Sequence, residues 1–229
     1  MAKKKVREEV PVEPVEEKLT RAEAYIEKNQ KMLTTVVSII VIVIVGFFLI
    51  KRYYIGGREA EAQREIWAAE RYFEQDSLDL ALYGDGNNPG FVDIVREYRW
   101  TRTARLARYY KGIIYLNQGQ FEQALSNLKR YKGRDKLVST MAIGAMGDAY
   151  LELNDLRRAA RHYERAASRH PNDLTSPIFF LKAAWTYEEK GDYKSALEMY
   201  ENIKYNHQKS NEGREVDKHI AKLKVKMGK

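Results

Sequence analysis

The chain has 229 residues, a formal net charge of +8 and 31% charged residues, which suits one modest domain with accessory segments. It contains no cysteine, which excludes a disulfide framework, a thiolate metal site and a cysteine nucleophile. The 40 basic residues are mixed with 32 acidic ones and no nucleic-acid motif accompanies them, so we expect no nucleic-acid partner.

The first predicted segment is a basic tail, residues 1–32. Residues 1–18 alternate Pro, Val, Glu and Lys without an apolar period, which predicts disorder, whereas residues 20–23 have the capping-box spacing that starts a helix. The tail carries eight Lys and Arg residues, and short basic tails normally stay in the cytoplasm. The flanks nearest the following apolar run are balanced, with four basic residues on each side, so an orientation with the large domain in the cytoplasm stays open.

The second segment, residues 33–50, contains no charged residue. As a helix rising about 1.5 Å per residue it covers roughly 27 Å, close to the hydrocarbon thickness of a bilayer. A buried core element and a cleaved signal peptide are the alternatives, but the small-residue site at 60–62 lies too far beyond the run for cleavage. We predict a retained transmembrane helix, with Tyr53 and Tyr54 at the membrane interface.

The remaining residues, 51–229, are predicted to form helical repeats. Three stretches share a pattern of small and large residues, in which Ala159 follows Ala124 by 35 residues and Ala196 follows Ala159 by 37. These periods are typical of a solenoid of helix-turn-helix units. The predicted repeats cover about residues 105–138, 140–173 and 177–210.

The pattern resembles the tetratricopeptide repeat. Small residues stand where that family brings two helices together, and aromatic or other large residues fill the spaces between them. The small positions are Gly112, Gly147, Ala184, Ala124, Ala159 and Ala196, and the large ones are Tyr115, Tyr150, Tyr187, Phe121, Leu156 and Tyr193. We therefore predict an all-α chain, with an N-terminal transmembrane helix followed by a tetratricopeptide-type solenoid.

Helices are also predicted on both sides of the repeats. Residues 58–83 are helical by period and supply an irregular first repeat, which the turn-rich residues 84–90 interrupt. A helix starting near Glu212 has an apolar stripe that suits a C-terminal capping helix.

Catalytic and metal-binding patterns are missing from the sequence. The four histidines lack zinc-ligand spacing and are expected at the surface or at helix ends. Asp85, Asn87 and Gly90 imitate the start of a calcium loop, but Pro89 and Arg96 replace later ligands, which indicates a turn. We expect no enzyme activity, no metal and no cofactor.

The resemblance implies a partner-binding groove, because the first helices of tetratricopeptide repeats line a concave surface. The alternative is that the aromatic rings at these positions pack between neighbouring repeats. The residues that would line the groove are Tyr109, Tyr110, Ile113, Asn117, Met141, Asp148, Glu152, Leu181, Lys182 and Trp185.

A series of basic residues precedes and enters the first clear repeat, with a positive charge at every third position from Arg96 to Lys111. On one continuous helix these charges would wind around the axis and not form a single face. A solvated shell is the simpler interpretation, and contact with lipid head groups or an acidic partner is the alternative.

Together, the tail, the single span and the repeats resemble the YfgM-like family of single-pass bacterial inner-membrane proteins. Stretches that support this are "YIEKNQKML", "NPGFVDIV", "RLARYYKGIIYLNQGQFEQAL" and "GDAYLELNDLRRA". The resemblance implies a cytoplasmic N-terminus and a periplasmic repeat domain. It also implies a non-catalytic adaptor of the Sec translocon channel that binds a PpiD-type membrane-anchored periplasmic chaperone and assists exported polypeptides. The alternatives are a scaffold for envelope assembly or polysaccharide export, and a regulator facing the cytoplasm.

Overall fold

The computed structural model describes residues 25–228, in two compact units that divide between Tyr54 and Ile55. The predictions for residues 1–18 and for the capping box at 20–23 lie outside the described residues. Within the described part the chain is all-α, which confirms the predicted fold class.

The first unit contains one long helix, α2 (Gln30–Leu49), followed by a π-helical segment, Ile50–Ile55, at the unit boundary. No residue of α2 is buried, although most of its residues are apolar and none after Ser38 is polar. An 18-residue window of this helix reaches a mean hydropathy of 3.0, and by length and composition it is the one described helix able to cross a membrane. This helix contains residues 33–49 of the predicted span, and the span itself stays a prediction.

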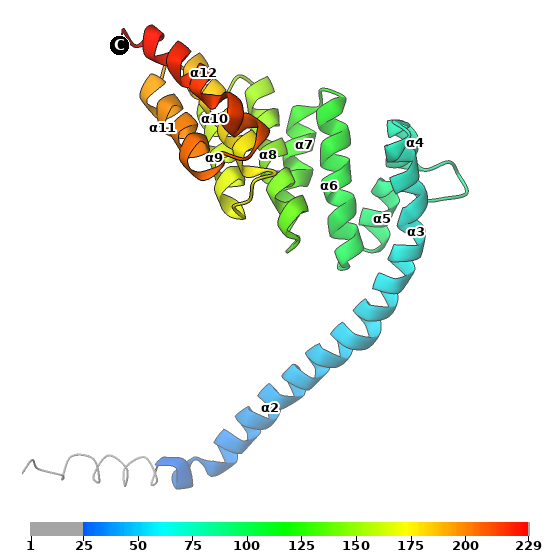
Figure 1. Ribbon diagram of the computed structural model, residues 1–229. Helices are drawn as coiled ribbons and strands as arrows, with labels where there is room; N and C mark the ends of the chain where they lie inside the picture. Colours follow the sequence, from blue (N-terminus) through cyan, green and yellow to red (C-terminus); the bar gives the residue numbers. More distant parts are fainter. Residues whose placement is uncertain (1–24, 229) are drawn as a thin grey trace, which may run out of the picture. The chain divides into compact units, whose positions relative to one another are not determined.

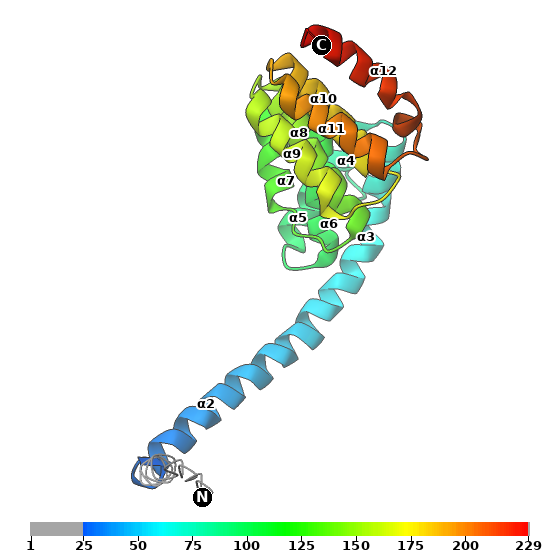
Figure 2. The same ribbon diagram turned by 60° about the vertical axis from the view of Figure 1, so that its left-hand side comes forward.

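The second unit consists of helices joined by short loops (Figure 1). Three antiparallel pairs, α6–α7, α8–α9 and α10–α11, follow one another, and α12 packs on the last pair at the C-terminal end (Figure 2). The helices are α3 (Gly56–Glu74), α4 (Leu78–Tyr83), α5 (Phe91–Glu97), α6 (Arg102–Asn117), α7 (Phe121–Arg130), α8 (Lys136–Glu152), α9 (Leu156–Arg169), α10 (Ser176–Glu189), α11 (Tyr193–Asn206) and α12 (Asn211–Lys226).

The turn inside each pair has the same conformation. Gly119, Asn154 and Gly191 stand at equivalent places in the three pairs, with positive φ angles of 73°, 57° and 79°. Glycine and asparagine adopt this left-handed region most easily. In the second and third pairs the following helix starts on an aspartate cap, with Asp155 accepting from the backbone N–H of Arg158. Local sequence therefore fixes where each second helix begins.

Glycines set the distance between packed helices. A Cβ atom added at Gly112 would lie 2.6 Å from the side chain of Leu128 on α7, and one at Gly147 would lie 2.6 Å from the ring of Tyr163 on α9. Gly144 has the same role between pairs, because a Cβ there would come within 2.0 Å of the Phe179 ring on α10. The small positions predicted at 112 and 147 thus are points of close helix approach.

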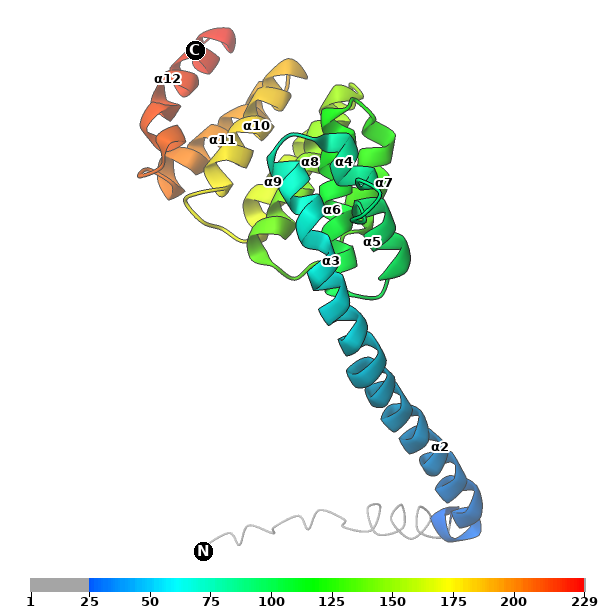
Figure 3. The ribbon, with the colours of Figure 1, turned by 90° about the vertical axis from the view of Figure 1, so that its right-hand side faces the viewer.

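The N-terminal end of the second unit differs from a regular repeat (Figure 3). The predicted helical stretch 58–83 is broken after α3, where Asp76 has a φ of 57°, and continues as the short α4. The turn that follows is held by Asp85, which accepts from the backbone N–H groups of Asn87 and Asn88 at 2.9 and 2.6 Å and from the hydroxyl of Tyr72 at 2.7 Å. This end of the domain therefore is stabilised by specific polar contacts rather than by repeat packing alone.

Contacts across the sequence tie α3 to the first clear repeat. Glu59 on α3 accepts from the backbone N–H and hydroxyl groups of Thr103 at 3.2 and 2.9 Å, at the start of α6. Arg58 pairs with Glu97 at the end of α5, with 2.6 Å between their charged groups. A carboxylate at a helix N-terminus is favoured by the unpaired N–H groups and the helix dipole. The irregular first repeat is therefore docked on the regular ones.

We predict that Gly144→Ala destabilises the domain. The added methyl group must displace the buried ring of Phe179, and overpacking of this kind costs roughly 1–3 kcal/mol, which outweighs the gain in helix propensity. Gly57→Ala is the control, because nothing lies within 4 Å of the added atom. Urea unfolding followed by circular dichroism should show a lower midpoint for Gly144→Ala than for the parent, and no decrease for Gly57→Ala. Equal midpoints for the two variants would contradict the packing described here.

Candidate partner-binding site

The first helices of the three pairs, α6, α8 and α10, carry all the residues predicted to line a groove. Leu137, in the first turn of α8, is 53% exposed. Beyond that turn, the exposed apolar side chains of α8 and α10 are Trp185 at 50%, Ile178 at 40% and Met141 at 39%. Two of these, Met141 and Trp185, were predicted from the sequence as groove residues. We call the exposed side of α8 and α10 that bears these three residues the first-helix face.

The aromatic residues of α6 are largely packed. The ring of Tyr110 stacks on Phe91 with centroids 4.8 Å apart and lies 5.1 Å from Phe73. Burial, helped by the charge of Glu70, raises the pKa of Tyr110 to about 12. Tyr109 lies 5.8 Å from the ring of Tyr131. These contacts are the packing between neighbouring units that the sequence left open as the alternative.

Two of the predicted groove residues are engaged with each other. Lys182 on α10 donates to Asp148 on α8 at 2.7 Å, and the hydroxyl of Tyr163 donates to the same carboxylate oxygen at 2.7 Å. Both charged side chains are about a third exposed, so the ion pair stabilises the fold only modestly. Its main effect is to fix the spacing of α8 and α10 beneath the first-helix face.

The other predicted groove residues divide by position. Ile113 and Leu181 are partly buried against the core, so they contribute packing more than free surface. Asn117 and Glu152 are exposed and end their helices, α6 and α8. The structure thus leaves Met141 and Trp185 as the exposed apolar members of the predicted set.

Trp185 is bordered by the capping helix. The ring of His219 on α12 lies 6.2 Å from Trp185 and stacks on Tyr200 at 5.4 Å. Glu188, one turn beyond Trp185, accepts from the Tyr200 hydroxyl at 2.6 Å and from Lys226 at 2.7 Å. Burial alone would raise the pKa of Glu188, but the bonds from Lys226 and Tyr200 outweigh it and lower the pKa below its ordinary value. The capping helix therefore is tied to the helix that carries Trp185.

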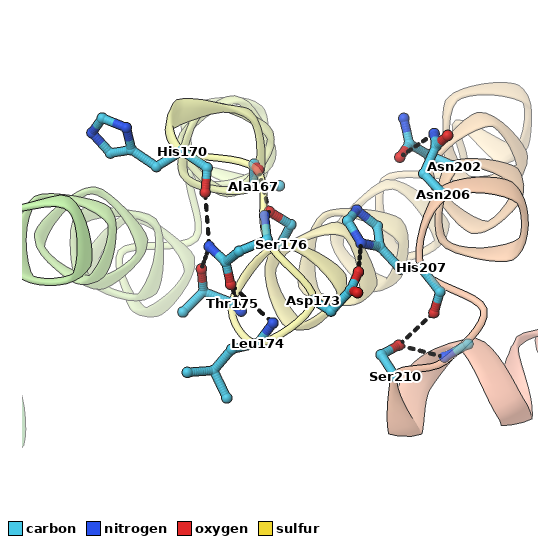
Figure 4. A network of polar contacts seen from close by, with 12 residues as sticks. Ala167, His170, Asp173, Leu174, Thr175, Ser176, Asn202, Asn206, His207 and Ser210 are labelled. Carbon is cyan, nitrogen blue, oxygen red and sulfur yellow. Dashed lines mark hydrogen bonds and ion pairs between the residues drawn. The ribbon is translucent and has the colours of Figure 1, made fainter.

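A polar network at the start of α10 connects the third helix pair to the second (Figure 4). The side-chain oxygen of Asn172 accepts from the backbone N–H groups of Leu174 and Thr175 at 2.9 and 2.7 Å. The hydroxyl of Ser176 donates to the carbonyl of Ala167 on α9 at 2.7 Å. The network positions α10, and with it Trp185.

One of the four histidines is buried at its helix end. His207 ends α11 as predicted for a helix-end residue, but it is buried and not at the surface, with its Nδ1 atom 2.8 Å from the Asp173 carboxylate. Its ring lies 6.0 Å from that of Phe180, and its carbonyl accepts from the hydroxyl of Ser210 at 2.8 Å (Figure 4). It is buried because the loops before α10 and after α11 come together, which local sequence does not show.

The basic series also differs from the prediction. Arg96 to Lys111 do not lie on one helix, because α5 ends at Glu97 and the side chain of Thr101 caps a new helix by accepting from the backbone N–H of Ala104 at 3.0 Å. The cap residue is a recognisable signal that the interpretation by period alone missed.

Consecutive antiparallel helix pairs that pack on one another define a helical-repeat protein. Residues 142–175 match one family model of the tetratricopeptide repeat, and residues 106–135 and 179–210 match another. These segments coincide with the three helix pairs, so the chain contains tetratricopeptide repeats. Comparison with curated proteins and with solved structures gave no match.

We predict that Glu188→Gln lowers the stability of the domain at neutral pH by roughly 1 kcal/mol, because it removes a charged hydrogen-bond acceptor. The folded pKa of Glu188 lies below the unfolded value, so this contribution is present above the ordinary pKa of 4.5 and is lost as the pH falls through the folded pKa. Melting curves at pH 7 and about pH 3 should show the deficit only at pH 7. Glu189→Gln is the control, and a deficit equal to that of Glu188→Gln would contradict the assignment.

Proposed function

We propose that the protein is a membrane-anchored adaptor that binds other proteins through its tetratricopeptide repeats. The observation that carries the proposal is the combination of three repeats with an apolar helix that buries none of its side chains. A helix of this composition is unfavourable in water and favourable in a bilayer, where its backbone hydrogen bonds are satisfied internally. The anchor is residues 33–50 and the binding domain is residues 51–229.

The proposed location is the bacterial inner membrane, with residues 1–32 in the cytoplasm and the repeats in the periplasm. Support for this orientation comes from the eight basic residues of the tail. Support for the partners comes from the resemblance to the YfgM-like family. The adaptor then works beside the Sec translocon channel, binds a PpiD-type anchored chaperone, and assists exported polypeptides without catalysis.

The first-helix face is the surface that we propose for the chaperone. Trp185 stands half exposed on a helix fixed from two sides, by the Asp148–Lys182 pair and by the capping helix. Rigid exposed tryptophans are the side chains that most often dominate binding energy at protein interfaces. Met141 on α8 and Ile178 on α10 are further exposed apolar side chains of this face. Tyr110 is not included, because its ring packs against Phe91.

The orientation is tested by single cysteines, since the chain has none of its own. Lys4→Cys and Asn154→Cys place a thiol in the tail and in the exposed turn between α8 and α9. In whole cells with a permeabilised outer membrane, an impermeant maleimide should label position 154 and leave position 4 unlabelled until the inner membrane is broken. Labelling at position 4 alone would place the repeats in the cytoplasm and overturn the proposal.

The partner is tested by photo-crosslinking in intact membranes. A benzophenone amino acid at Trp185 should crosslink an anchored periplasmic chaperone, whereas one at Tyr205 on α11, which is more exposed than Trp185, should not. Trp185→Ala should weaken recovery of the chaperone, since a hot-spot aromatic contributes about 2 kcal/mol or more. Recovery of an envelope-assembly or polysaccharide-export complex, with no Sec component or chaperone, would replace the translocon by the scaffold function.

A further inference from the structure

A cleft lies between α7 and α9, which are the second helices of their pairs, and it includes none of the three residues that define the first-helix face. It is a cleft of about 650 Å³ whose walls come from the end of α7, the loop after it and α9, and whose floor comes from α8. It involves neither Trp185 nor the capping helix. We call it the α7–α9 cleft.

The cleft exists because α7 is short. It has 10 residues and ends at Arg130, whereas α9 has 14 and continues to Arg169. After α7 the chain turns extended at Tyr131 and runs without helix to Asp135, which caps α8. Contact between α7 and α8 is accordingly less extensive than contact between α9 and α10. The last turn of α9 therefore extends beyond the end of α7.

All the charged side chains that line the cleft are basic. They are Lys129, Lys132, Arg134, Arg165 and Arg169. All five are exposed, and none takes part in the ion pairs found within residues 25–228. The chain has 32 acidic residues, yet none of them lines this hollow. A concave surface with charges of one sign concentrates the electrostatic potential and attracts opposite charge.

The positive surface continues from the cleft onto α6. Burial and then the neighbouring Arg130 and Arg105 lower the pKa of Arg108. Burial and then Arg108 and Arg130 likewise lower the pKa of Lys111. Crowded like charges cost folding free energy, and an anionic partner would relieve that cost.

The floor of the cleft is apolar, with Ile143 and Met146 of α8, and Leu128 of α7 adds an apolar side chain beside them. The face of the Tyr150 ring is already occupied, with Lys129 at 5.4 Å, Arg158 at 4.5 Å and the His162 ring at 4.9 Å. The second tyrosine that lines the cleft, Tyr131, packs with its ring 5.8 Å from that of Tyr109. Neither ring is an open platform for base stacking, which disfavours a nucleobase as the occupant. An aliphatic or aromatic side chain flanked by carboxylates fits both the floor and the rim.

We propose that the α7–α9 cleft binds an acidic, extended segment of a partner protein, with an apolar side chain of that segment inserted against α8. The occupant is a polypeptide because tetratricopeptide repeats bind proteins and because the apolar floor lies beneath the cationic rim. The site is separate from the first-helix face, and it depends neither on the anchor nor on the translocon.

The test uses the full-length protein in dodecyl maltoside and a fluorescein-labelled peptide, EEELFEEE. Arg165→Gln with Arg169→Gln should weaken binding in fluorescence anisotropy by about tenfold, as expected for two lost charge contacts. Arg157→Gln with Arg161→Gln is the matched control, because these exposed arginines lie on the same helix outside the cleft and should change little. Lys132→Gln with Arg134→Gln, both in the loop after α7, should also weaken peptide binding, and this variant changes no helical residue.

Three results would overturn the proposal. The first is that the parent protein does not bind the peptide, or that the cleft variants and the control variant bind the peptide with equal affinity. The second is equal binding of EEEGGEEE, which would show a charge effect without use of the apolar floor. The third is displacement of the peptide by inorganic phosphate or dioctanoyl phosphatidylglycerol at low millimolar concentration, which would indicate a phosphate or lipid site. Trp185→Ala should leave peptide binding unchanged, so failure here is distinct from failure at the first-helix face.

Discussion

The close approach of neighbouring helices at glycine is the contact on which the rest of the domain depends. Gly112 and Gly147 bring the two helices of a pair together, and Gly144 brings one pair against the next. Because a single helix pair buries too little apolar surface to be stable alone, the domain exists only if these contacts repeat along the chain. The first-helix face and the α7–α9 cleft are consequences of this stacking.

The sequence predicts best those parts of the fold whose contacts join residues that are near each other in the chain. The helix pairs were predictable, because small and large residues recur at 35 and 37 residues and the contacts they make lie within a repeat or with its neighbour. The burial of His207 was not, because it depends on two loops that meet across a whole repeat. For Tyr110 the sequence left packing open as an alternative, but it did not identify Phe91 and Phe73 as the partners. These two residues belong to the N-terminal end of the domain, where the repeat pattern is absent.

The two candidate binding surfaces differ in physical character. The first-helix face bears the exposed apolar residues Trp185, Ile178 and Met141, and its charged residues Asp148 and Lys182 neutralise each other. The α7–α9 cleft holds unpaired cations above an apolar floor. Binding at the first should change little with salt, whereas binding at the second should weaken as salt screens the charges. The run "KRYKGRDK" at 129–136 was a sequence signal for the second surface, but only the fold brings Arg165 and Arg169 beside it.

A membrane anchor changes how strong these surfaces need to be. If α2 spans the bilayer, the repeats share a thin layer with every partner anchored in the same membrane, and their effective concentration there is far above that in bulk solution. Under those conditions each of the two candidate surfaces needs only a modest affinity for a partner. A partner that engages both surfaces binds more tightly than either surface alone would allow, because the second contact forms within the same complex. Modest single affinities also let a bound partner be released again. A tight groove closed on all sides would bind more strongly, but it would slow that release.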